Sequence, residues 1–142
     1  MAKQSKKIKG NVLEKKKCFV VSVDVFEVDI SFFINYSTEE MLKESGKIST
    51  KLQKYLTEYI EKEEPDTDSI LGRMYPLKSG YAVKLKFFKN SFRLNVALVA
   101  HEVSHLVSWI LLDRCVPLSK DSDEVYAYLT EDIMKKFLFK WY

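Results

Sequence analysis

The chain has 142 residues, 46% of them hydrophobic and 13% aromatic, which is enough for one globular domain and excludes a wholly disordered chain. Its two cysteines lack CxxC spacing, which excludes a disulfide scaffold. The formal net charge is +3, but residues 1–17 carry seven lysines against one glutamate, so the remainder is mildly acidic.

We interpret residues 1–17 as a basic, flexible arm before a single domain, residues 18–142. Such an arm can contact nucleic acid or a membrane surface, but it is more often a solvated tail, so we expect neither partner. No signal-peptide pattern follows the arm, and three ionisable side chains interrupt the apolar stretch Val96–Leu112. We therefore expect a soluble, cytoplasmic protein.

Residues 18–35 are rich in β-branched and aromatic side chains, which predicts β structure. The apolar positions change phase near Val25 and Phe26, from odd to even numbers. Two interpretations fit this change: a β-bulge in one long strand, or a tight reversal between two strands. Because no glycine or Asn-Gly pair occurs there, we favour the bulge.

Residues 37–40, Ser-Thr-Glu-Glu, form a capping-box pattern that predicts a helix start. An apolar stripe continues from there to Tyr59, and Gly46 is the candidate break between two helical pieces. The acidic segment 61–69 ends the helical pattern at Pro65. Without alternating carboxylates and glycine, it is a solvated loop in preference to a calcium site.

Residues 78–80, Lys-Ser-Gly, predict a turn before a strand that buries Tyr81, Val83, Leu85 and Phe87. Lys84 and Lys86 then share its other face, which is typical of a sheet edge.

A long helix follows, with Asn90 or Ser91 as its N-cap. We expect it to end near Arg114, because Val116-Pro117 cannot continue it. The final helix is predicted to start at Asp121 or Ser122 and to reach the aromatic C-terminal residues.

The only histidines of the chain, His101 and His105, flank Glu102 in the motif HEVSH. At about 100° of rotation per residue, the two imidazoles lie about 40° apart on one side of the helix, one turn apart. Both can therefore reach one ion. The pattern predicts that the histidines hold Zn²⁺ and that Glu102 is the general base toward a zinc-activated water.

The helix that carries this motif is apolar on almost every face, so we expect it to be interior. Two imidazoles and a carboxylate without partners there would each cost about 2–7 kcal/mol. A bound metal removes that cost. The alternative is a chance motif whose side chains bond to one another or to the backbone.

A catalytic zinc site has three protein ligands and one open position. The third histidine of the longer metzincin pattern is absent, because position 111 is Leu111. We favour Glu124, since a turn after the long helix can fold the next helix back antiparallel. The other candidates are Asp121, Asp123 and, least favoured, Cys115. In the alternative interpretation, residues 121–124 are an N-terminal cap, with Glu124 as its capping-box residue.

Tyr128 lies one turn after Glu124, and we expect it to donate to the developing oxyanion. Tyr126 and Glu131 are further candidates for a catalytic role. For all three, packing or solvent exposure is the alternative.

The motif HEVSH at 101–105, followed by EVYAY at 124–128, resembles the gluzincin class of zinc metallopeptidases, in the minimal form found in small phage- and prophage-encoded proteins. The resemblance covers Tyr81–Lys136. It implies an α+β, zincin-like fold, in which a small, twisted, mainly antiparallel sheet packs against the motif helix and a C-terminal helix. It also implies a peptide substrate bound as an extra strand on the sheet edge, here residues 80–87. The zinc ligands and the base that it implies are His101, His105, Glu124 and Glu102.

The sequence departs from larger relatives of that class, because it has no second domain and no histidine outside the motif. We predict a single-domain zinc metallopeptidase that cleaves a peptide or protein substrate. The alternative is a catalytically inactive zincin that acts as a protein-binding module. A third possibility is a nucleic-acid-associated factor that uses the lysine-rich arm.

Overall fold

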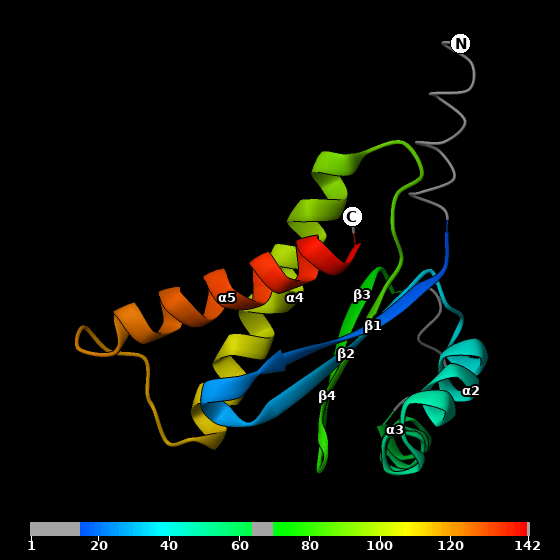
Figure 1. Cartoon of the computed structure of the whole chain (residues 1–142), viewed down its shortest axis with the longest axis horizontal. Coiled ribbons are helices and arrows are strands. Elements are labelled where there is room, and N and C mark those ends of the chain that lie inside the picture. The colour runs from blue at the N-terminus through cyan, green and yellow to red at the C-terminus, as the bar shows by residue number, and fades with distance from the viewer. Residues whose placement is uncertain (1–14, 64–69, 142) are drawn as a thin grey trace.

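A four-stranded sheet lies between two pairs of helices in the computed structural model, which describes residues 15–63 and 70–141 (Figure 1). The elements are β1 (Lys17–Val23), the short 3-10 helix η1 (Asp24–Phe26), β2 (Val28–Ile34), α2 (Thr38–Ile48), α3 (Thr50–Glu63), β3 (Gly72–Leu77), β4 (Gly80–Leu85), α4 (Phe92–Asp113) and α5 (Asp123–Trp141). Most of the predicted basic arm and of the predicted acidic loop lies outside the described residues.

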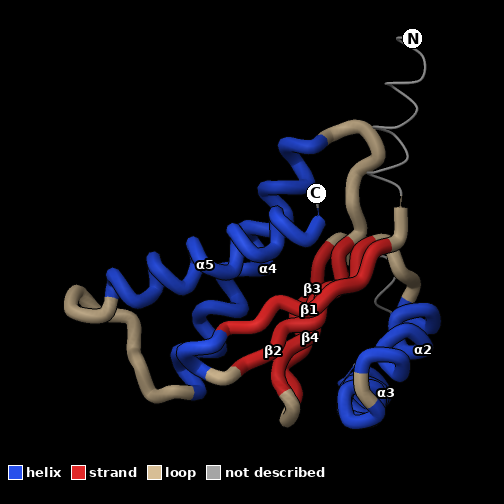
Figure 2. The backbone as a smooth tube through the Cα atoms, viewed as in Figure 1, coloured by secondary structure: helices blue, strands red, loops and turns tan. Residues whose placement is uncertain are grey.

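The strand order is β1-β2-β4-β3, with β2 and β4 parallel and the other two pairs antiparallel. Helices α4 and α5 cover one face of the sheet, and α2 and α3 cover the other (Figure 2). The predicted α+β class is confirmed, as is a mainly antiparallel sheet packed against the motif helix and the C-terminal helix.

The phase change near residue 25 marks a reversal, so the predicted bulge is wrong. β1 and β2 pair antiparallel from Lys17 opposite Ile34 to Val23 opposite Val28, and η1 turns the chain between them. Glu27 closes the turn in the left-handed region, at φ 51°. A glutamate seldom adopts this conformation, so the residue types there do not predict a turn.

The capping box at the start of α2 is confirmed. The Ser37 hydroxyl accepts from the Glu40 N–H, and the Glu40 carboxylate accepts from the Ser37 N–H. The break between α2 and α3 falls at Ser49, which has extended backbone, and not at Gly46. Gly46 instead lets the two helices approach, because a Cβ there would lie 2.8 Å from the Gln53 side chain.

β4 is an inner strand, so the predicted edge position of residues 80–87 is wrong. It pairs with β2 on one side and with β3 on the other, and the edges are β1 and β3. Lys84 is accordingly buried, with 3% of its surface exposed. Pro76 lies in β3, and proline inside a strand is typical of an edge.

Helices α4 and α5 cross antiparallel on their side of the sheet (Figure 1). At one end the Trp141 ring stacks on Phe92, with ring centroids 5.4 Å apart. At the other end the Tyr126 hydroxyl donates to the Val116 carbonyl over 3.1 Å. Ser91 is the N-cap of α4, as predicted.

Of the helices in the described ranges, α4 alone is long and apolar enough to cross a membrane by length and composition. Of the most apolar 18-residue window of α4, a share of 44% is buried inside the protein. The core helix of a soluble protein has the same composition, so this property does not identify a membrane span.

Candidate metal site

The two histidines lie together near the middle of α4, as their spacing predicts. The His101 and His105 Nε2 atoms are 3.2 Å apart, and the ring planes meet at 80°. This separation allows one imidazole to donate an N–H to the other, and it also allows both nitrogens to face a common ion.

Both imidazoles are exposed, so the expectation that they are buried is wrong. Other residues of α4 that face away from the sheet are exposed too, and they include small or hydroxylated side chains, Ala97, Ala100, Ser104 and Ser108, as well as large apolar ones. Apolar composition therefore did not imply burial on this face. The free-energy cost of unpartnered imidazoles, which was the argument for a metal, does not apply to exposed rings.

Glu102 is the buried member of the motif, with 4% of its surface exposed. Its side chain lies against β3, where a Cβ on Gly72 would be only 2.7 Å from Glu102 Oε1. Burial raises the pKa of the Glu102 carboxyl, and the two imidazoles lower it by a smaller amount. The result is a carboxylate that holds a proton more readily than an exposed glutamate does.

The structure does not place Glu124 with the histidines. Within residues 15–63 and 70–141, no group of three or more His, Cys, Asp or Glu side chains could hold a metal ion. Glu124 is exposed in the first turn of α5. Its role as a ligand stays a prediction.

The crossing of α4 and α5 explains this position. Because Tyr126 is bonded to Val116, the first turn of α5 lies level with the chain that follows α4. His105 precedes the last residue of α4, Asp113, by about 12 Å of helix. The antiparallel turn forms as expected, and Glu124 lies in the first turn of α5, near the chain that follows α4.

The remaining candidates are also apart from the histidine pair. Tyr128 is 67% exposed and lines a cavity with η1 and the end of β1, to which neither histidine contributes. Glu131 forms an ion pair with Lys135 over 3.0 Å. Cys115, Asp121 and Asp123 are exposed and belong to no such metal-binding group.

Two features of the structure were missed in the sequence. Gly72 makes room for the Glu102 carboxylate, and a glycine inside a strand is a recognised signal of such close approach. The sequence pattern predicts Lys84 and Lys86 on a sheet edge, yet both line a cavity of about 510 Å³. The position of these two lysines follows from the pairing of β4 on both sides, which no local sequence pattern predicts.

Comparison with protein-family models, curated proteins and solved structures finds no significant match. The resemblance to gluzincins therefore rests on the two motifs, HEVSH and EVYAY, and stays a prediction.

Proposed function

We propose that this protein is a zinc-dependent hydrolase acting on peptide bonds, with His101 and His105 as metal ligands and Glu102 as general base. The observation that carries the proposal is the 3.2 Å between the two Nε2 atoms. Two nitrogens, each about 2.0–2.1 Å from a tetrahedral zinc, are about 3.3–3.4 Å apart. The imidazole pair thus fits the ion with little rearrangement.

Zinc, when bound, acts as a Lewis acid that acidifies water and polarises a carbonyl. Glu102 supplies the proton acceptor. Burial raises the pKa of the Glu102 carboxyl, so this group takes up a proton more readily than an exposed glutamate does. The Glu102 side chain occupies the space that the absence of a Cβ at Gly72 leaves open between α4 and β3.

The proposed substrate is an extended peptide that adds to the sheet at β3. The resemblance implies an edge strand next to the motif helix, and β3 meets that condition because Gly72 contacts Glu102. The other edge, β1, is covered by α5, where Lys136 and Lys140 donate to the carbonyls of Ser22 and Val20. We also propose that the protein is cytoplasmic.

Zinc content tests the metal site. The purified protein is expected to hold one zinc per chain, and His101→Ala or His105→Ala should reduce it to background. Ser108→Ala, on the same exposed face of α4, is the matched control and should retain the metal. A wild-type protein that takes up no zinc would overturn the proposal.

The Glu124→Ala variant tests the third ligand. Loss of zinc comparable to that of the histidine variants would support Glu124 as a ligand and would require α5 to shift along α4. Unchanged zinc affinity would contradict this assignment.

Peptide cleavage tests the base. Glu102→Gln should keep zinc bound and reduce turnover by about 10²–10⁴-fold. Glu58→Gln, which removes an exposed carboxylate of α3 on the other face of the sheet, should cleave at the wild-type rate. Wild-type turnover by Glu102→Gln would exclude this mechanism.

Gly72→Ala tests the placement of the base by a route that leaves its chemistry intact. The added Cβ displaces the Glu102 carboxylate, so kcat should fall while zinc content stays at the wild-type level. An unchanged kcat would show that the contact does not position Glu102.

The second candidate function is a non-catalytic zincin that binds a protein partner. The outward face of α4 favours it, since Leu94, Trp109 and Leu112 are 52%, 42% and 64% exposed on the helix that carries the exposed histidines. Zinc binding without cleavage across a broad peptide library would favour this function over hydrolysis.

A further inference from the structure

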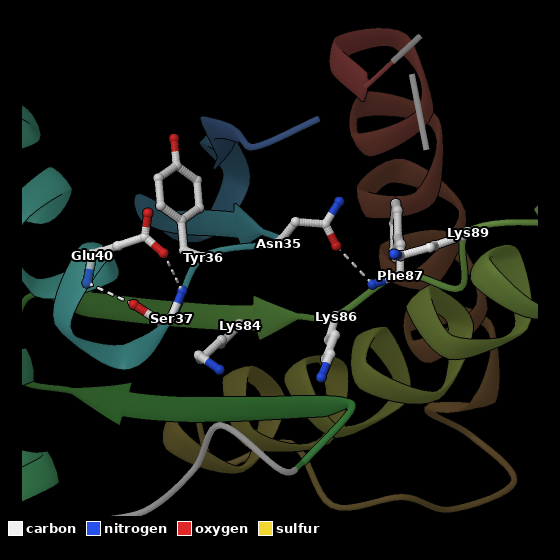
Figure 3. Close-up of a pocket in the computed structure, with 8 residues that line it drawn as sticks. All are labelled: Asn35, Tyr36, Ser37, Glu40, Lys84, Lys86, Phe87 and Lys89. Atoms are coloured by element: carbon white, nitrogen blue, oxygen red, sulfur yellow. Dashed lines mark hydrogen bonds between the residues drawn. The ribbon is translucent and has the colours of Figure 1, made fainter. Parts of the chain in front are cut away.

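A cavity of about 510 Å³ opens on the α2/α3 side of the sheet, where β2 and β4 end (Figure 3). It is lined by Asn35, Tyr36, Ser37, Glu40, Lys84, Lys86, Phe87 and Lys89. Of these residues, 35–37 follow β2 and Glu40 lies in the first turn of α2. The others belong to the end of β4 and the chain after it.

The position of this cavity in the topology is that of a ligand site. β2 and β4 are parallel neighbours, so their carboxyl ends lie at the same end of the sheet. From there the chain enters α2 on one face of the sheet, but it enters α4 on the opposite face (Figure 1). Two adjacent parallel strands whose connections diverge in this way leave a crevice between them, where open α/β sheets bind their ligands.

The charge of the cavity selects an anion. Figure 3 shows Lys84 and Lys86 extending from the same side of β4, with Lys89 on the segment that follows. Among the described residues that line the cavity, the acidic side chain is Glu40, which already accepts from the Ser37 N–H and from the Lys16 ammonium. Three ammonium groups around one crevice produce a positive potential that attracts an anionic ligand.

The burial of Lys84 adds to this effect. With 3% of its surface exposed, this side chain is held against the sheet, so little conformational entropy is lost when an anion binds near it. The N-terminus of α2 contributes less, because its Glu40 N–H already donates to the Ser37 hydroxyl and the Glu40 carboxylate accepts from the Ser37 N–H. The lysines therefore supply the recognition.

The size and walls of the cavity indicate the rest of the ligand. Small-molecule sites are commonly about 300–1,000 Å³, and this cavity is several times larger than a phosphate ion needs. Tyr36 and Phe87 add two aromatic side chains to the lining. Tyr36 can pack against an organic group attached to the phosphate, whereas the Phe87 ring is buried against Trp141.

We propose that this crevice binds a small organic phosphate, with Lys84, Lys86 and Lys89 around the phosphoryl group and Tyr36 beside the organic part. The site lies on the opposite face of the sheet from Glu102, so it does not depend on the proposed hydrolase function.

Calorimetric titration of the full-length protein tests the proposal with three probes: AMP, adenosine and inorganic phosphate. AMP should bind saturably at one site per chain, and phosphate should compete with it. Adenosine, which lacks the phosphate, should bind at least about tenfold more weakly, because it makes no charge-assisted bonds to lysine. Absence of saturable AMP binding, or equal affinity for adenosine, would overturn the proposal.

Two double variants separate the site from general charge. Lys86→Gln with Lys89→Gln should weaken AMP binding about tenfold or more, and both side chains are exposed, so the fold should be retained. Lys43→Gln with Lys51→Gln removes the same charge from exposed positions outside the cavity and should leave the affinity unchanged. Equal weakening by both pairs would show non-specific attraction. Binding of a single-stranded oligonucleotide in place of AMP would assign the lysines to nucleic acid and reject the small ligand.

Discussion

The two faces of the sheet differ in how completely they are packed. On the α4/α5 side, aromatic rings meet edge to face: Phe137 lies 4.8 Å from Phe32 and 5.2 Å from Phe19, centroid to centroid. The α2/α3 side has a smaller apolar cluster, and its strands also present Lys84 and the buried hydroxyl of Ser31. The densely packed face fixes the helix with the HEVSH motif, whereas the other face ends in an open, cationic crevice. The tightly packed core and the open crevice thus lie on opposite faces of one sheet.

The largest effect is expected from Phe137→Ala on the densely packed face. Phe137 is fully buried, and its removal should lower the free energy of unfolding by about 3–5 kcal/mol. Urea denaturation measures this loss. Phe139→Ala, on the same helix but 86% exposed, should change stability by less than about 0.5 kcal/mol. Similar losses in both variants would contradict the described packing of α5.

A smaller loss is expected on the α2/α3 side. Leu56 of α3 is fully buried, and Leu56→Ala should cost about 2–4 kcal/mol in the same urea assay. Leu112→Ala, a leucine 64% exposed on α4, is the control and should be near neutral. If Leu56→Ala cost more than Phe137→Ala, the ranking of the two faces would be reversed.

The capping box on the α2/α3 side gives the next effect. Ser37→Ala removes the acceptor for the Glu40 N–H and should lower the free energy of unfolding by about 1 kcal/mol. Ser37→Asp keeps an acceptor at that position and should recover most of the loss. A Ser37→Ala variant as stable as the wild type would show that the cap adds nothing.

The smallest effect concerns the two thiols. Burial, and then the charge of Glu44, raise the pKa of Cys18 from 9.0 to about 11. Iodoacetamide at pH 8 should therefore label the exposed Cys115 and spare Cys18 until the protein is unfolded in urea. The neutral Cys18 thiol stabilises the fold fully below about pH 9, and that contribution is lost as the pH rises through about 11. Equal labelling at pH 8 would contradict the burial of Cys18.

Local signals predicted the helices well, because caps are written in neighbouring residues, as Ser37 and Ser91 show. The strand order was not predictable in the same way. Whether β4 is an edge or an inner strand depends on its pairing with β2, which is distant in the chain, and with β3, whose glycine and proline do not predict a strand. This pairing decides that Lys84 is buried.

In the candidate site, too, local geometry was predictable and the features that depend on tertiary packing were not. The spacing of His101 and His105 fixed their mutual geometry, since both lie on one helix. It could not fix their exposure, which depends on which face of α4 the sheet covers. The position of Glu124 depends on where α5 crosses α4, and that crossing is set by contacts at the two ends of the helices.

The single parallel pairing also has a kinetic consequence. β1 with β2 and β3 with β4 are hairpins whose strands are close in the chain, so each can form early at a low entropic cost of loop closure. The seam between them joins Ile30 to Tyr81 and requires the whole intervening segment to be in place. In the last step of folding, the two preformed hairpins should therefore pair along β2 and β4. The lysine-lined crevice, which lies where these two strands end, forms only in that step.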